Sequence, residues 1–295
     1  LSLFVLLPVM IVMLSLMRLL EARGVLDWIV HRLAPLLKPI GLTGLGVFAA
    51  LQISFVSFAA PVATLTMMEQ RGASDRHIAA TLAMVMAMAQ ANVMIPMTAM
   101  GLDFGTTLGL SLLGGLLAAA ATYYLFGRNL SAEEGVLDET LHHAVVNSGK
   151  GVLDVINRAG AEAFKIAVGS IPMLVLALVI VMALRSTGAI DALTRGLAPF
   201  MAMLHWDPAM ILPTLTKYIA GGTAMMGVMD EMLRNGAATV ATLNHGAGFL
   251  IHPLDLAGVA VLVSAGRRVA GVWRPAVLGA AAGIVVRTLG HALFT

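Results

Sequence analysis

The chain has 295 residues, of which 59% are hydrophobic and only 12% are charged, and its net charge is +2. Soluble globular domains have about 45–50% apolar and about 25% charged residues, so this composition excludes an ordinary soluble domain. The absence of cysteine excludes disulfides and thiolate metal sites, and the small net charge gives no indication of a nucleic-acid partner, which we do not expect.

Long runs without a charged residue predict membrane-spanning helices, and they cover residues 39–68, 78–102, 104–127 and 166–184. Each run reaches or exceeds the roughly 18–20 residues that carry a helix across the hydrocarbon core of a bilayer. The alternation of a membrane β-barrel is absent. The first apolar run lacks a basic start and a small-residue cleavage site, so we interpret it as a spanning helix rather than a signal peptide. The sequence therefore predicts an all-α polytopic protein whose surroundings are the lipid bilayer.

An internal repeat organises the chain. Residues 8–73 match residues 172–237 without a gap at an offset of 164, and 13 of the 66 positions are identical. The segments "GVLDWIVHRLAP" and "GAIDALTRGLAP" are one motif written twice. Duplication of this kind is typical of transporter folds. We divide the chain into a first repeat (1–127), a linker (128–165) and a second repeat (166–295).

Each repeat is predicted to contain five elements: an apolar helix, a short amphipathic segment, an interrupted stretch, and two more apolar helices. In the first repeat these are residues 2–20, 25–38, 43–71, 76–100 and 105–126, and in the second they are 166–184, 189–204, 208–234, 237–262 and 275–294. Asp207-Pro208 is a favourable helix start, because it supplies a capping acceptor and a proline at the first helical position. The linker is the only long hydrophilic segment, and we expect it to be partly helical.

Basic residues decide whether the third element of each repeat crosses the membrane. If it enters and returns to the same side, each repeat crosses three times and the two repeats are inverted. Thirteen basic residues then lie on one side and three (Arg185, Arg195 and Arg234) on the other, whereas a spanning third element splits the same residues 9 to 7. The positive-inside rule favours the inverted arrangement, with both termini outside and residues 128–165 in the cytoplasm.

The third elements are therefore predicted to be re-entrant hairpins. In "LTKYIAGGTAMMGVMDEMLRNG" (215–236), Gly221-Gly222 would lie near the tip and Asp230-Glu231 at the surface. Non-helical backbone at membrane depth is tolerated only where it is buried in protein or lines a wet cavity. The two hairpin tips are accordingly candidate sites, and we expect them to approach each other near the middle of the bilayer.

This layout resembles the Gate-domain or "nucleoside recognition" membrane proteins. They include the core of concentrative nucleoside transporters, the gate segments of ferrous-iron transporters, and spore maturation proteins A and B. The residues that carry the resemblance are "QISFVSFAAPVATLTMMEQRGAS" (52–74), "LTKYIAGGTAMMGVMDEMLRNG" (215–236) and the paired "LAP" segments.

The resemblance implies a substrate site between the two hairpin tips and two broken helices, around Pro96 and Pro253. The implied substrate-binding residues are Gln52, Ser54, Ser57, Gln90, Asn92, Lys217, Tyr218, Gly221, Gly222, Thr223, Asn244, His245, His252 and Asp255, with Thr98 also near the first break. The acidic residues with which nucleoside transporters hold ribose have no evident match at these positions.

The polar residues within the apolar segments also have structural interpretations. Lys217 either meets a substrate group or extends to the interface, and Asp255 either acts in the site or caps the helix after Pro253. His252 either carries a coupled proton with Asp255 or bonds a carbonyl freed by the proline. Sodium is a candidate cofactor near Gln90, Asn92 and Thr98, where the alternative is that these residues only repair the break. No other cofactor or metal is expected.

The sequence favours a secondary transporter of a small polar solute, nucleoside-like or another small metabolite, coupled to sodium or protons. The alternative is a non-transporting membrane component of an envelope- or spore-maturation type of complex, with residues 128–165 as a docking surface. Motifs of hydrolases and paired catalytic carboxylates are absent, so we do not expect an enzyme. We expect a homo-oligomer in the bacterial cytoplasmic (inner) membrane.

Overall fold

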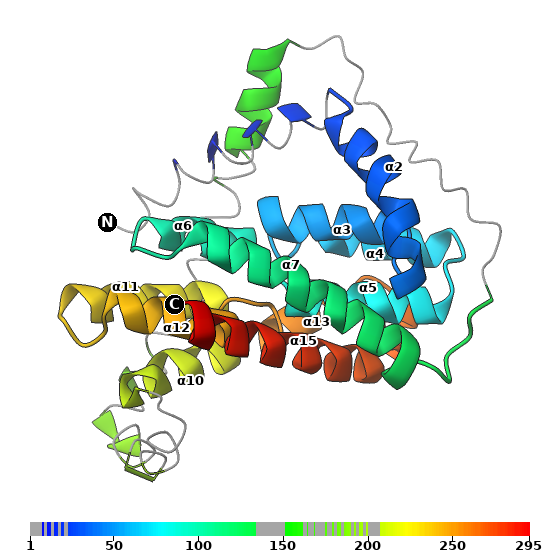
Figure 1. The fold of residues 1–295 in the computed structure, drawn as a ribbon. Coiled ribbons are helices and arrows are strands. Elements are labelled where there is room, and N and C mark those ends of the chain that lie inside the picture. Colours follow the sequence, from blue (N-terminus) through cyan, green and yellow to red (C-terminus); the bar gives the residue numbers. More distant parts are fainter. Residues whose placement is uncertain are drawn as a thin grey trace.

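The computed structural model describes residues 23–133, 151–161 and 207–295 continuously, together with separate positions between 8 and 20 and between 164 and 199. Every regular element within these residues is a helix. Figure 1 shows a bundle in which the long helices of the two halves of the chain lie side by side, while α2 (Val25–Leu37) stands apart from them.

The first repeat has an interrupted third and an interrupted fourth element. Its helices after α2 are η1 (Lys38–Ile40), α3 (Gly44–Phe55), α4 (Pro61–Gln70), α5 (Asp75–Ala87), α6 (Ala91–Thr98), α7 (Phe104–Ala121) and the π-helical turn η2 (Thr122–Phe126). We call α3 and α4 hairpin 1 and the segment 88–90 break 1. The chain bends by 108° between Trp28–Ile40 and Gly44–Phe55.

The second repeat, as far as the structure describes it, shows the same order. Its helices are η3 (Pro208–Met210), α10 (Ile211–Ala220), α11 (Gly222–Arg234), α12 (Val240–Leu250), α13 (Leu256–Val263), α14 (Arg267–Gly271) and α15 (Trp273–Phe294). We call α10 and α11 hairpin 2 and the segment 251–255 break 2.

Side-chain caps explain where several of these helices begin. Thr43, Ser74, Asp103 and Thr239 each accept a hydrogen bond from a backbone N–H in the first turn of the helix that follows. Such a cap satisfies one of the N–H groups that have no partner inside the helix. The hydrogen bonds that Asp103 accepts from the backbone N–H and hydroxyl of Thr106 also lower the pKa of its exposed carboxyl.

The core lies where α5, α7, α12 and α15 pack together. Close approach depends on glycine, as is common in membrane helices. A Cβ added at Gly279 of α15 would lie 2.8 Å from the carbonyl oxygen of Ala118, and one added at Gly248 of α12 would lie 2.7 Å from the Cα of Thr288. Helix α5 is buried on all sides from His77 to Ala87.

The described chain contains three helical stretches that are long and apolar enough to cross a membrane: Asp75–Thr98, which is α5 and α6 counted across break 1, Phe104–Phe126 and Trp273–Phe294. The bent pair of Trp28–Ile40 and Gly44–Phe55 would make a fourth if it counts as one span. The protein is thus a multi-pass helical membrane protein, as its composition predicts.

The structure agrees with the predicted elements in most places and corrects one. Residues 25–38 form α2, residues 105–126 form α7 and its π-helical turn, and residues 152–160 of the linker are helical. The first broken helix, however, is interrupted at 88–90 and not around Pro96, which lies inside α6. The predicted apolar helices at 2–20 and 166–184, the amphipathic segment 189–204 and most of the linker lie outside the described residues.

Candidate functional site

The tip of hairpin 1 is a short turn that its own side chains brace. Helix α3 ends at Phe55 and α4 begins at Pro61, which needs no backbone N–H at a helix start. The hydroxyl of Thr64 donates to Oε1 of Gln52 over 2.7 Å and joins the two arms. Ser54 and Ser57 are buried beside the turn, and the hydroxyl of Ser54 has no hydrogen-bond partner within the described residues.

Break 1 brings polar groups next to hairpin 2. The chain is extended at Met88 and Gln90, so helical hydrogen bonds are interrupted there. The backbone N–H of Ala89 instead donates to the hydroxyl of Ser111 on α7 over 2.7 Å. The buried side chain of Gln90 lies against Gly222, the first residue of α11, because a Cβ added at Gly222 would overlap its amide nitrogen. Glycine therefore allows hairpin 2 to approach break 1.

Asn92 connects the two hairpin tips. Its Oδ1 accepts a hydrogen bond from the backbone N–H of Phe58 in the turn of hairpin 1 over 3.3 Å. Its Nδ2 donates to the hydroxyl of Thr223 at the start of α11 over 3.5 Å. Both distances are at the long end of the hydrogen-bond range. One side chain in the first turn after break 1 thus contacts both hairpins.

The tip of hairpin 2 is a single residue, Gly221, with φ 87° and ψ 171°. L-residues rarely adopt a positive φ, so glycine allows the chain to turn between α10 and α11 here. Lys217, in the last turn of α10, is fully buried and forms an ion pair with the buried carboxylate of Asp255. Lys217 therefore does not extend to the interface. Its neighbour Tyr218 is 38% exposed, and the Lys217 Nζ lies 5.5 Å from the centre of the Tyr218 ring.

Break 2 follows Leu250 and contains Pro253. Asp255 has two partners there: Lys217, and the backbone N–H of Gly258, which donates to Oδ1 over 2.7 Å. The capping role and the pairing with lysine are therefore both present. His252 is fully buried, and its Nδ1 accepts from the N–H of Leu254 over 3.1 Å. Its Nε2 has no partner within the described chain.

Asn244 and Thr98, two of the predicted site residues, make their hydrogen bonds away from the hairpin tips. Asn244 donates to the carbonyl oxygens of Gly101 and Val240 over 3.0 and 2.9 Å, and it accepts from the N–H of Asp103 over 2.7 Å. This amide joins α12 to the turn before α7, and its hydrogen bonds are structural. Thr98 is also separate in character, since it is exposed and its hydroxyl donates to Ile95 in its own helix.

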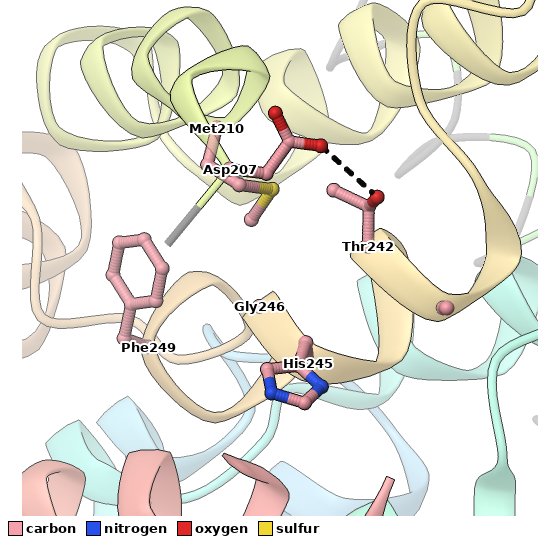
Figure 2. Close-up of a pocket in the computed structure, with 7 residues that line it drawn as sticks. Asp207, Met210, Thr242, His245, Gly246 and Phe249 are labelled. Carbon is pink, nitrogen blue, oxygen red and sulfur yellow. Dashed lines mark hydrogen bonds between the residues drawn. The ribbon is translucent and has the colours of Figure 1, made fainter. Parts of the chain in front are cut away.

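His245 lines a surface cavity of about 210 Å³ between η3, with its cap Asp207, and one face of α12. Figure 2 shows the carboxylate of Asp207 at its upper edge, bonded to the hydroxyl of Thr242 over 3.4 Å, with the His245 ring opposite. Asp207 also caps η3, as the Asp-Pro sequence predicts. The cavity is lined by Asp207, Met210, Ala241, Thr242, His245, Gly246 and Phe249.

Comparison with known proteins supports the resemblance. Residues 3–106 match the family model Gate, described as nucleoside recognition. The match agrees with the resemblance seen in the sequence. It covers the first repeat as far as the first turn of α7 and so includes hairpin 1, break 1 and Asn92. No curated protein matches the sequence.

Solved structures of the concentrative nucleoside transporter CNTnw share the fold of nearly the whole chain. The inward-facing substrate-bound state has a TM-score of 0.70 at 17% identity, covering 97% of this chain and 73% of CNTnw. Two variants in outward-facing states have TM-scores of 0.73 and 0.72 at 17% identity, covering 100% and 99% of this chain and 75% of CNTnw in both cases. At this identity the likeness concerns the fold.

Two residues near the breaks were not among the predicted site residues. Ser111 binds the freed N–H of Ala89, and Arg287 donates to backbone carbonyls at both breaks. A serine in an apolar helix does not by itself predict that its hydroxyl binds a freed backbone group. An arginine in the middle of an apolar helix does predict a partner inside the protein, but the sequence does not identify the two carbonyl groups that Arg287 binds.

Proposed function

We propose that the protein is a secondary transporter of a small polar solute, nucleoside-like or another small metabolite, held between the two hairpin tips and the two helix breaks. The observation that carries this proposal is the position of Asn92. It follows the backbone break in one repeat and contacts Phe58 and Thr223, one at each hairpin tip. A solute that replaced these two long hydrogen bonds would be sensed by both hairpins at once.

Contacts at the two ends of the bundle support an inverted arrangement of the repeats. Re-entrant hairpins put the turn at 101–105 on the same side as the start of α12, and the turn at 71–75 on the same side as the end of α13. Spanning third elements would put the members of each pair on opposite sides. Asn244 bonds Gly101 at one end, and Arg268 bonds Asp75 at the other.

Together with the distribution of basic residues, these contacts support an orientation with both termini outside and residues 128–165 in the cytoplasm. The membrane of this proposal is the bacterial cytoplasmic membrane. Under this orientation, hairpin 1 enters from the cytoplasmic side and hairpin 2 from the outside. The cavity beside Asp207 and His245 then opens toward the outside, on the side from which hairpin 2 enters.

The free hydrogen-bonding capacity at the tips suits an uncharged polar solute. The hydroxyl of Ser54 is buried and has no hydrogen-bond partner within the described chain, and the buried amide of Gln90 lies beside Gly222 at the tip of hairpin 2. An amide and a hydroxyl can each donate and accept, which matches the carbonyl, amine and hydroxyl groups of a nucleoside-like compound. Lys217 is committed to Asp255, so in this conformation its ammonium does not face a solute.

Coupling to sodium or to protons is part of the proposal. A sodium ion would bind near Gln90 and Asn92, beside the extended backbone of break 1. A coupled proton would use His252 and Asp255, both of which lie in break 2. Thr98 is the weaker member of the proposed ion site, because its hydroxyl bonds the carbonyl of Ile95.

Ligand-induced stabilisation followed by transport in proteoliposomes tests this function. The purified protein is heated with nucleosides, nucleobases and other small metabolites, with and without sodium, and each stabilising compound is then assayed for uptake. We expect uptake driven by a sodium or pH gradient, and a loss of about tenfold or more in Asn92→Ala. Asn129→Ala, at an exposed asparagine outside the candidate site, is the matched control and should transport normally. A stabilising compound that is never carried, or equal uptake by Asn92→Ala, would contradict the proposal.

A further inference from the structure

Arg287 lies in the middle of α15, and its side chain is fully buried. Its guanidinium extends to both broken helices at once. Nη1 donates to the carbonyl oxygen of Ala87, the last residue of α5, and Nη2 donates to the carbonyl oxygen of Ile251 over 3.1 Å. Ile251 directly follows the last residue of α12. The two acceptors are 164 residues apart in the chain and belong to different repeats.

Both acceptors are carbonyls that the breaks have freed. In an uninterrupted helix, the carbonyl of Ala87 would accept from the N–H four residues later, but the chain is extended at Met88 and Gln90. The carbonyl of Ile251 would accept from Asp255, whose N–H instead donates to Pro253 over 2.9 Å. An unsatisfied carbonyl at membrane depth is costly, and a guanidinium has the donors to satisfy two of them.

The surrounding helices are shaped to admit this side chain. A Cβ added at Gly114 of α7 would lie 2.7 Å from Cδ of Arg287, so glycine leaves room there for the arginine stem. Gly248 of α12 lets the backbones of α12 and α15 approach at the same residue, since a Cβ there would lie 2.8 Å from the carbonyl carbon of Arg287. Within the described residues, Arg287 has no carboxylate partner, so its positive charge is held by the two backbone carbonyls. Holding a buried charge in this way is expensive, which indicates a role beyond filling space.

We propose that Arg287 is a positioning residue that ties break 1 and break 2 into one unit with α15. Its two hydrogen bonds fix the last turns of α5 and α12, and thereby the polar residues in each break and just after break 1. These are Gln90 and Asn92 on one side and His252 and Asp255 on the other. The breaks then form a fixed pair around which the hairpins can rearrange. This inference concerns the fold and does not depend on the solute or on transport.

Hydrogen exchange of the purified protein tests this role without a substrate. The variant Arg287→Met keeps most of the apolar stem and removes both donors. We expect the backbone amides flanking both breaks, in residues 84–92 and 247–256, to exchange about tenfold faster or more, because a hydrogen bond from a charged group is lost at each. Amides at the base of hairpin 1, in residues 66–75, should not change.

Two further variants make the result specific. Thr288→Val removes a hydroxyl that bonds only Ile284 in the same helix, and it should leave both breaks unchanged. Arg287→Lys keeps the charge but lacks the fork that reaches two carbonyls, so it should protect no more than one break. If Arg287→Met does not accumulate, Arg287→Lys is compared with wild type in the same way. A change at neither break in the donor-free variant, a change at only one, or equal acceleration throughout α7 and α15 would overturn the proposal.

Discussion

The two hairpins occupy equivalent places in the repeat, and Asn92 contacts the tip of each, but their other anchors differ: hairpin 1 has further bonds at its base, and hairpin 2 has its buried ion pair at its tip. Hairpin 1 is fixed at its base. Thr66 donates to the carbonyl of Ala265 over 2.7 Å, and the N–H of Val269 donates to Glu69 over 3.4 Å. These bonds join residues about 200 positions apart. They connect the end of hairpin 1 to α14 and to the residue Ala265 just before it.

Hairpin 2 is held at its tip. Lys217 pairs with Asp255 at break 2, and Thr223 accepts from Asn92 after break 1. At its base, Arg234 pairs with Asp230 one turn earlier in the same helix over 3.0 Å. This difference in anchoring suggests that hairpin 1 belongs to the rigid part of the protein. The position of hairpin 2 depends on contacts inside the candidate site. A change at the site should therefore move hairpin 2 first.

The largest expected effect is a difference in thiol labelling between the bases of the two hairpins, which should lie on opposite sides of the membrane. Single cysteines at Gln70 and Arg234, both exposed, can be introduced into a chain that has no cysteine. If the repeats are inverted, an impermeant thiol reagent added to intact cells should label residue 234 and leave residue 70 unlabelled until the cells are opened. The contrast should be close to all or none. Labelling of both residues, or of residue 70 alone, in intact cells would break the comparison.

The second effect concerns the buried pair at the tip of hairpin 2. Removing one partner of a buried ion pair leaves an uncompensated charge and costs about 3–5 kcal/mol, so Lys217→Met should lower the free energy of unfolding by about that amount. Combining it with Asp255→Asn removes the remaining charge and keeps an acceptor for Gly258, so most of the stability should return. The midpoint of thermal unfolding in detergent measures both changes.

The exposed Lys38 is the matched control for this series, because Lys38→Met should change stability by less than about 0.5 kcal/mol. If Lys217→Met is as stable as the wild type, the ion pair does not contribute to the free energy of unfolding. The double variant also separates stability from function. If it is stable but inactive once a solute is known, the pair has a role in transport beyond folding.

Sequence reasoning located the hairpin tips because their signals are local. Lys217 and Gly221-Gly222 could not belong to an ordinary spanning helix, and the structure places the turn of hairpin 2 at Gly221. Pro253 likewise marks break 2. Pro96 misled the prediction of break 1, since a proline inside a membrane helix is tolerated when neighbours satisfy the freed groups. The actual break at 88–90 contains no proline or glycine.

The position of break 1 and the partners of Asn244 depend on contacts between segments far apart in the chain. Such contacts cannot be predicted from a single sequence. Break 1 is stabilised by Ser111 on α7 and by Arg287 on α15. Asn244 was predicted to face the solute, because an amide within an apolar helix looks the same whether it binds a ligand or a neighbouring turn. The structure shows that it binds Gly101 and Asp103.

The smallest expected effect concerns the base of hairpin 1, and it tests whether that base is held more firmly than its counterpart. Arg268 pairs with Asp75 over 2.7 Å and donates to the carbonyl of Ala73 over 2.7 Å. Both side chains of the pair are about one-third exposed, which weakens the pair, so Arg268→Ala should cost about 1–2 kcal/mol. Limited proteolysis and hydrogen exchange in residues 66–75 should report the loosening.

Arg234→Ala provides the matched comparison at the base of hairpin 2. Arg234 is more than half exposed and pairs within its own helix, so its loss should cost about 0.3–0.5 kcal/mol and leave the exchange of residues 225–236 nearly unchanged. The expected order is therefore a clear effect for Arg268 and little effect for Arg234. Equal effects, or a larger effect for Arg234, would mean that both hairpins are anchored alike at their bases. The contrast between a fixed and a movable hairpin would then have to rest on the tip contacts of Lys217 alone.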